Sequence, residues 1–262
     1  MNDLLARAER LANEVLFPAS LATDTGARVP EAHLQLLARE GLFGVFGPPE
    51  LGGIASASAV FAQLVEVLAS GCLTTAFVWI QHHIAVQALA ATPDSALARA
   101  WLADLCAGRR RTGLALGGLR PGPLQLRARP VSGGWLLDGT VPWVTGWQLV
   151  DALLAFALSP EQERLSLLLD AVPADTLSMT PQRLVAANAS CTVEIRFREH
   201  FVARERLVAS EPYTPPPAHD GEHAERLARE ALFLLVFGSR PAIRTALLET
   251  LGVLGETPPA RR

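Results

Sequence analysis

Two short clusters of residues in this sequence have side chains of the types that bind metal ions or cofactors. The first is HDGEH at residues 219–223, in which His219, Asp220, Glu222 and His223 are all able to bind a metal ion. A zinc site needs ligands that a rigid frame aims at one point, and this cluster directly follows a run of prolines, with no supporting cysteine or HExxH pattern. We therefore expect a polar linker and helix cap here, and no metal site.

The second cluster is WVTGW at residues 143–147, which follows a predicted strand. In an extended chain Trp143 and Thr145 lie on the same side, so a large aromatic face stands next to a hydroxyl. A flat conjugated cofactor uses both, because an indole can cover the ring face while a hydroxyl hydrogen-bonds a ring nitrogen. The ordinary alternative is a core tryptophan on a strand, and these residues taken alone favour that alternative.

Residue types that are missing from the sequence exclude several classes of enzyme. All 23 basic residues are arginine, so the lysine of a Schiff base and the lysine of a P-loop are both lacking. The sequence also contains no GxGxxG, GxSxG or GxxxxGK[ST] motif. Rossmann-type dinucleotide binding, serine hydrolysis by a nucleophile elbow and nucleotide hydrolysis therefore lack their signatures.

Charge, cysteine usage and hydropathy indicate the cellular compartment and the classes of partner to expect. The formal net charge is −3, with no basic tail, so we expect no nucleic-acid partner. Cys72, Cys106 and Cys191 are far apart, which fits a reducing compartment. The first 15 residues carry acids and arginines where a signal peptide needs an apolar core, and polar residues interrupt the apolar stretch 72–91. We expect a cytoplasmic protein that does not span a membrane.

Two further groups of charged or titratable residues have ordinary interpretations. His82 and His83 lie within an apolar helical stretch, so we expect one to face the core and hydrogen-bond there while the other borders a pocket. Residues 109–111 are three arginines that end a helical region, where cations interact favourably with the helix dipole and the last carbonyls. A phosphate clamp is the alternative for the arginines.

The elements that must position these residues fall into three parts, so the fold class expected is α+β. Residues 1–111 have apolar residues at spacings of three and four, which predicts about five helices, with starts signalled at Pro30 and Pro93. Residues 112–210 predict a β domain, and residues 218–262 predict a shortened helical segment beyond an extended proline-rich linker at 211–217. The strands are expected around residues 135–137, 150–158, 165–169 and 192–197, and the late helices over 222–237 and 242–251.

The order of motifs resembles that of the acyl-CoA dehydrogenase family of flavoproteins. Residues 41–53 (GLFGVFGPPELGG) resemble the family's helix-to-loop segment, and residues 133–139 with 143–145 (GGWLLDG and WVT) resemble its central strand pair. Three further stretches follow the family pattern in the same order, namely residues 64–78, 101–108 and 189–208.

The resemblance implies a helical N-terminal domain, a central β-barrel or sheet domain, and a helical C-terminal segment. It also implies an FAD cofactor, with Trp143 and Thr145 in contact with the flavin. The backbone around Leu114, Leu116, Gly117 and Gly118 would face the pyrimidine edge of the flavin or the acyl thioester. The chemistry implied is α,β-desaturation of an acyl-CoA or related thioester, with an electron-acceptor flavoprotein as a further partner.

Two departures from the family pattern bear on activity. The loop at residues 115–122 (ALGGLRPG) lacks the acid and hydroxyls of the family loop, and only some forty residues follow the linker. Some family members carry the base that removes the α-proton on the first helix after the β domain, where Glu225 stands in this sequence. We expect weak or lost desaturation by a homodimer or a complex with a fuller relative; the alternative is a non-catalytic homologue acting as a partner subunit or binding module.

Overall fold

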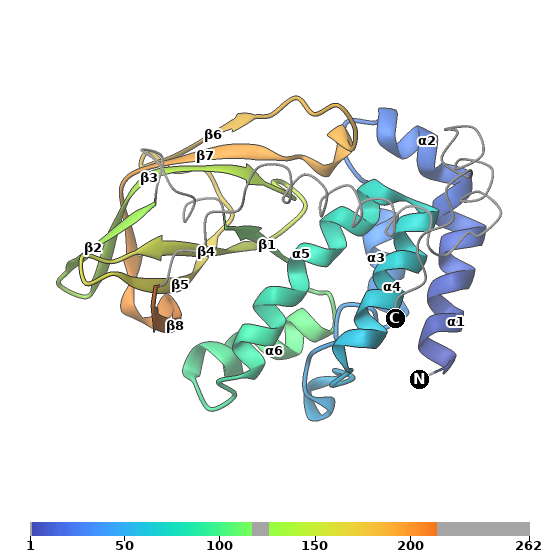
Figure 1. The fold of residues 1–262 in the computed structure, drawn as a ribbon, viewed down its shortest axis with the longest axis horizontal. Helices are drawn as coiled ribbons and strands as arrows, with labels where there is room; N and C mark the ends of the chain where they lie inside the picture. The colour runs from blue at the N-terminus through green and yellow to red at the C-terminus, as the bar shows by residue number, and fades with distance from the viewer. Residues whose placement is uncertain (1, 117–125, 214–262) are drawn as a thin grey trace, which may run out of the picture.

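The computed structural model describes residues 2–116 and 126–213, which form a helical region followed by a mixed β-sheet (Figure 1). This confirms the α+β class and the order of its first two parts. The helices are α1 (Asn2–Leu11), the π-helical turn η1 (Ala12–Leu16), α2 (Phe17–Thr25), α3 (Glu31–Arg39), the 3-10 turn η2 (Pro49–Leu51), α4 (Ser58–Gly71), α5 (Leu73–Ala90) and α6 (Ala96–Cys106). The helices predicted after residue 213 lie outside the described residues.

The helix boundaries follow local capping chemistry. α3 begins at Glu31 directly after Pro30, as the sequence predicted. The second predicted start, at Pro93, is wrong: α6 begins at Ala96, because the hydroxyl of Ser95 accepts a hydrogen bond from the backbone N–H of Ala98 at 3.0 Å. No helix in the described ranges is both long enough and apolar enough to cross a bilayer.

Eight strands form one open sheet with the order β6-β7-β3-β2-β4-β5-β8, and β1 pairs with β4 in parallel. The strands are β1 (Thr112–Ala115), β2 (Arg127–Val131), β3 (Gly134–Val144), β4 (Ala152–Leu158), β5 (Glu163–Asp170), β6 (Leu177–Pro181), β7 (Val193–Ala203) and β8 (Leu207–Pro212), with 3-10 turns η4 (Asn188–Ser190) and η5 (Arg204–Arg206) on either side of β7. Strands β3, β4, β5 and β7 correspond to the four apolar runs that the sequence indicated, although β4 begins at Ala152 and β7 at Val193 instead of at residues 150 and 192.

Four strands were not among those predicted, and the reason is their composition. β2 and β8 contain charged residues and proline, and β6 is mostly exposed, so none of them shows a clear apolar run. β1 has only four residues, too few for an alternation to be recognised. The linker prediction is also wrong at its start, because Glu211 and Pro212 belong to β8, which pairs with β5.

The core joins the two regions through β4, which is buried along its whole length. Alternate residues point to opposite faces of a strand. Leu153 and Ala155 pack in the core inside the β region, whereas Leu154 and Phe156 pack against residues of α5 and α6 such as Leu105. Burial on both faces explains the uninterrupted apolar sequence of this strand. Figure 1 shows α5 and α6 next to the sheet, with the other helices further from it.

Candidate functional site

Trp143 lies at a β-bulge near the end of β3. Val141 pairs with Ile195 and Val144 pairs with Val193, so two residues of β3 face one residue of β7 at this point. Trp143 has a φ of 61°, and its backbone N–H donates to the side-chain carbonyl of Gln182 at 3.0 Å. The bulge turns the indole outward, where it is 52% exposed. An exposed tryptophan held at a rigid bulge is suited to stacking on a flat ligand.

The two tryptophans of the WVTGW cluster therefore have different environments. Trp147 is buried in the core of the β region, and the ordinary interpretation as a core tryptophan applies to it. The same interpretation does not describe Trp143, which is the more exposed of the two.

Thr145 lies directly after β3 and is buried, with 2% of its surface exposed. Its hydroxyl lies 3.2 Å from the hydroxyl of Thr192, which in turn lies 2.8 Å from the hydroxyl of Ser190. The pairing of Val144 with Val193 places Thr145 opposite Thr192 across the two strands, because antiparallel partners run in opposite directions. The sequence-based reason for placing Trp143 and Thr145 on one side is wrong, since the bulge and the positive φ interrupt the regular alternation.

Strand β1 lies against Thr145. A Cβ atom added to Gly113 would come within 2.8 Å of the Thr145 carbonyl oxygen, so only glycine permits this approach. Leu114 follows in the strand and is 8% exposed, while Leu116, just beyond the strand, is 51% exposed. The fold thus brings residues 113–116 next to the segment that begins at Trp143. The other predicted site residues, Gly117, Gly118 and Glu225, lie outside the described residues.

His82 is a buried structural residue that ties α5 to β1. Its Nδ1 accepts a hydrogen bond from the backbone N–H of Thr112 at 3.2 Å, so the ring is neutral and its proton is on Nε2. Burial lowers the pKa of His82 to about 3, and the carbonyls of Leu105 and Phe43 offset only part of that effect. This confirms that one of the two histidines faces the core and hydrogen-bonds there.

His83 is equally buried but lies among aromatic rings. The ring centroids of Trp79, Phe61 and Phe46 lie 4.4, 4.8 and 6.0 Å from that of His83. Burial and the neighbouring His82 hold the pKa of His83 well below its ordinary value. Neither ring nitrogen has a hydrogen-bond partner among the described residues. The expectation that the second histidine borders a pocket is wrong, because only 1% of its surface is exposed.

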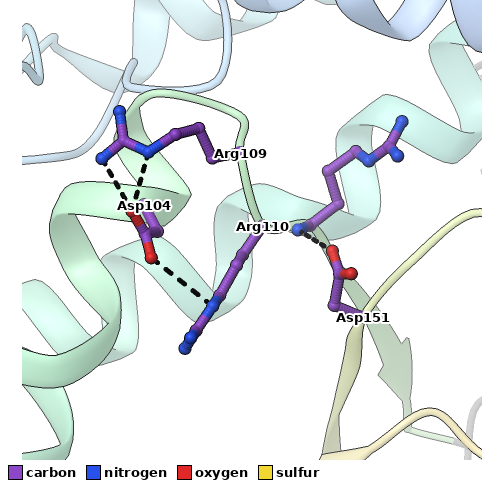
Figure 2. Close-up of polar contacts among 5 residues, drawn as sticks. Asp104, Arg109, Arg110 and Asp151 are labelled. Carbon is purple, nitrogen blue, oxygen red and sulfur yellow. Dashed lines mark hydrogen bonds and ion pairs between the residues drawn. The ribbon is translucent and has the colours of Figure 1, made fainter.

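The three successive arginines form the turn between α6 and β1. Figure 2 shows Asp104 between two of them, with its carboxylate 2.7 Å from Arg109 and 3.4 Å from Arg110. The guanidinium of Arg111 pairs with Glu31 of α3 at 3.0 Å, and the backbone N–H of Arg111 donates to the carboxylate of Asp151 at 2.8 Å. Each guanidinium already has a carboxylate partner, which supports a helix-end and turn role over a phosphate clamp.

A cavity of about 640 Å³ lies beside this turn, at the junction of α6 with the sheet. Arg110 and Arg206 lie over the ring of Trp101 in its wall, at 4.5 and 5.5 Å from the centroid. Arg206 is paired with both oxygens of Asp170 at 2.5 Å. The charges of this cavity are therefore largely neutralised by one another, and the cavity does not include Trp143.

No group of three or more His, Cys, Asp or Glu side chains in the described ranges could hold a metal ion. The cysteines at 72, 106 and 191 are free thiols. The cluster at residues 219–223 lies outside the described residues.

The site that remains is the one around Trp143, and its donor set fits a flavin. The exposed indole offers a stacking face, and Thr145 belongs to a series of three hydroxyls that contains only two hydrogen bonds. One hydroxyl proton of this series thus has no acceptor among the described residues, and a ring nitrogen is an acceptor that would satisfy it.

Comparisons with known proteins concern the family and the fold of this chain. The family model for the acyl-CoA dehydrogenase N-terminal domain matches residues 2–109. The human mitochondrial short-chain specific acyl-CoA dehydrogenase is 24% identical over 159 residues, which are 59% of this chain and 39% of that protein. The chain thus spans well under two thirds of the length of this relative.

Solved structures show the same fold at low sequence identity. A probable acyl-CoA dehydrogenase from Mycobacterium abscessus has a TM-score of 0.73 at 19% identity, over 99% of this chain and 70% of that one. The HsaA monooxygenase from M. tuberculosis has a TM-score of 0.65 at 20% identity, over 80% of this chain and 52% of that one. The N-terminal domain match, the curated relative and the shared fold together support an acyl-CoA dehydrogenase-like family member.

Proposed function

We propose that this chain binds FAD against Trp143 and Thr145 and is an oxidoreductase of acyl thioesters, with weak or no desaturation by the isolated chain. The observation that carries the proposal is the exposed Trp143 indole, fixed at a bulge two residues before the buried Thr145. Bound FAD would supply a two-electron acceptor for the hydrogen leaving the β-carbon of the thioester.

The roles of the chain's own residues follow from their environments. The Trp143 indole would cover one face of the ring, and Gln182 holds the backbone of Trp143 in the geometry that exposes it. The Thr145 hydroxyl would donate to a ring nitrogen. The backbone from Leu114 to Gly118 would border the ring edge or the thioester, since Gly113 already brings β1 against Thr145.

Glu225 is the proposed base that removes the α-proton. An α-carbon next to a thioester is a weak acid, so a base must stand within hydrogen-bond reach and a donor must stabilise the carbonyl oxygen. Residues 115–122 offer no side-chain acid or hydroxyl for this purpose. Because this loop lacks such polar side chains, we expect slow or absent desaturation of the thioester.

The first experiment is to purify the chain, record its absorption between 350 and 500 nm as about the range of flavin bands, and identify the released flavin as FAD or FMN. A flavin-free chain would contradict the proposal and support the non-catalytic homologue as the alternative. If flavin is present, anaerobic bleaching by a panel of acyl-CoA thioesters measures the reaction itself. We expect slow or no bleaching.

Two variants separate the base from its neighbours on the chain. Glu225→Gln removes the proposed base, and Glu230→Gln is the matched control, since a residue five positions further along the helix that the sequence predicts over residues 222–237 would point elsewhere. Any bleaching should disappear in the first variant and persist in the second. Rapid bleaching in the wild type would overturn the expectation of weak activity, and equal loss in both variants would overturn the assignment of the base.

The proposal also includes a substrate, an electron acceptor and an oligomeric form. We propose an acyl-CoA or related thioester as substrate, an electron-transfer flavoprotein as the acceptor, and a cytoplasmic homodimer or a complex with a fuller relative as the working form. The fold shared with HsaA monooxygenase makes an oxygen-dependent reaction of the reduced flavin the second activity to assay.

A further inference from the structure

Ser190, Thr192 and Thr145 form a series of three buried hydroxyls. The Oγ atoms of Ser190 and Thr192 are 2.8 Å apart, and those of Thr192 and Thr145 are 3.2 Å apart. Their exposed fractions are 0%, 4% and 2%. The surrounding backbone is fixed as well, because the N–H groups of Gly146 and Trp147 donate to the carbonyls of Ser190 and Cys191 at 2.9 and 3.2 Å.

Counting protons shows that this series has three possible arrangements. Each hydroxyl donates one proton, and the two hydrogen bonds of the series use two of the three. If Thr145 donates to Thr192 and Thr192 donates to Ser190, the spare proton is on Ser190. If both end hydroxyls donate to Thr192, the spare proton is on Thr192. If Ser190 donates to Thr192 and Thr192 donates to Thr145, the spare proton is on Thr145.

The environments of the three hydroxyls decide between these arrangements once a ligand is bound. Ser190 and Thr192 are buried and their hydroxyls have no further partner among the described residues, so a spare proton on either of them would remain unsatisfied. An unsatisfied buried donor is costly. Thr145 is two residues from the exposed Trp143, and the ring proposed to stack on Trp143 would supply an acceptor for it. The favoured direction therefore runs from Ser190 through Thr192 to Thr145.

We propose that Thr192 and Ser190 are positioning residues that orient the Thr145 hydroxyl proton toward the bound flavin, an inference that rests on the proposed function. Thr192 donates to Thr145, so the oxygen of Thr145 is already an acceptor and its own proton points away from Thr192. Hydrogen bonds in series polarise one another, which makes Thr145 a stronger donor than an isolated hydroxyl. A donor at a ring atom that gains electron density on reduction stabilises the reduced flavin and raises its midpoint potential.

The test compares midpoint potentials and flavin absorption spectra of five variants of the full chain. Thr145→Val removes the donor and should shift the redox equilibrium about tenfold toward the oxidised flavin, the size of one net hydrogen bond. For a two-electron couple this is a fall of about 30 mV. Thr192→Val should shift it in the same direction by about threefold, since the hydroxyl of Thr145 remains but loses its orienting donor. Thr192→Ser keeps the hydroxyl and should restore the wild-type potential.

The double variant Thr145→Val/Thr192→Val distinguishes positioning from a general structural effect. If Thr192 acts through Thr145, the double variant should have the potential of Thr145→Val alone. Thr180→Val is the control, because Thr180 is an exposed threonine on the neighbouring strand β6 and should leave the potential unchanged. Should Thr192→Val fail to fold by circular dichroism, Ser190→Ala replaces it with the same expected direction, since it removes the far end of the series.

The outcomes separate this inference from the function on which it rests. A wild-type chain without flavin overturns both. Bound flavin with an unchanged potential and spectrum in Thr192→Val overturns the inference and leaves the proposed function in place. An additive fall in the double variant also overturns it, because Thr192 would then act by a route that does not include Thr145.

Discussion

The two buried histidines predict a specific dependence of stability on pH. His82 has a folded-state pKa of about 3 against 6.5 for the free side chain, because it is fully buried. Between these two values the unfolded chain binds a proton that the folded chain does not, so stability falls as the pH falls. The limiting slope for one such group is about 1.4 kcal/mol per pH unit. Lowering the pH from 7.5 to 5 should therefore cost about 2 kcal/mol through His82 alone.

His83 should add to this loss in the same direction, since its pKa is also held well below 6.5 and its ring nitrogens lack partners among the described residues. Protonation of His82 would also remove the acceptor for the Thr112 N–H and so weaken the attachment of α5 to β1. The pair thus links acid sensitivity to the junction of the helices and the sheet.

The assay is urea unfolding at 25 °C, followed by circular dichroism, at several pH values between 7.5 and 5. His82→Asn keeps a side-chain oxygen that can accept from Thr112 but does not titrate, so its loss over this range should be smaller than that of the wild type by about 2 kcal/mol. His83→Phe should reduce the loss as well, because an apolar ring of similar shape replaces the imidazole. His200→Asn is measured alongside, because burial also lowers the pKa of His200 on β7, and its own contribution has to be known before the remaining loss is assigned to the pair.

The outcome that would refute this reasoning is an unchanged pH dependence in His82→Asn. In that case the acid sensitivity of the chain would come from groups other than the buried pair. A wild type whose stability is constant from pH 7.5 to 5 would be equally contrary to the depressed pKa of His82.

Three further predictions concern the flavin site, a turn and the assembly. Trp143→Ala should weaken flavin binding by at least tenfold, because a ring-sized stacking surface is lost, whereas Thr145→Val should alter the flavin spectrum more than the affinity; unchanged flavin content and spectra would contradict the assignment. Gly108→Ala should lower the free energy of unfolding by about 2 kcal/mol or more, since Gly108 has a φ of 67° and an added Cβ would lie 2.7 Å from atoms of two neighbours; urea unfolding measures this. The chain should form a dimer or larger assembly, because Phe77 and Ile84 expose 38% and 42% of their surfaces on α5; a monomer by light scattering at micromolar concentration would contradict this.

Much of the framework could be predicted from the sequence because it depends on local patterns. The three- and four-residue spacing of apolar side chains indicated helices before residue 112, and apolar runs such as residues 150–158 indicated buried strands, of which β4 forms 152–158. Capping was less predictable, since Ser95 and not Pro93 determines where α6 begins. Strands with little apolar character, such as β2, were missed because their position depends on pairing with β3 and not on their own composition.

Only some residues of the candidate site could be identified from the sequence. WVTGW identified Trp143 and Thr145 as residues of interest, because an aromatic face and a hydroxyl close together are visible in a short window. It could not show which tryptophan is exposed, since that depends on a bulge in β3 opposite β7. Gln182 and Thr192 were missed, because hydrogen bonds connect them to Trp143 and Thr145, which lie 39 and 47 positions earlier in the chain. Ser190 was missed because it joins the series only through Thr192.

By itself, then, the sequence determined what is encoded in composition and short-range spacing. Its basic residues are all arginine, it has no P-loop or nucleophile-elbow motif, and it predicts helices followed by strands. Its motifs also follow the order that resembles the acyl-CoA dehydrogenase family. Only the tertiary structure decided the direction of Trp143, the burial of Thr145 and the environments of His82 and His83. The physical reason is that exposure, pKa and hydrogen-bond direction are properties of contacts between distant segments. The antiparallel register of β3 and β7 creates those contacts at the site, and the packing of α5 against β1 creates them at the histidines.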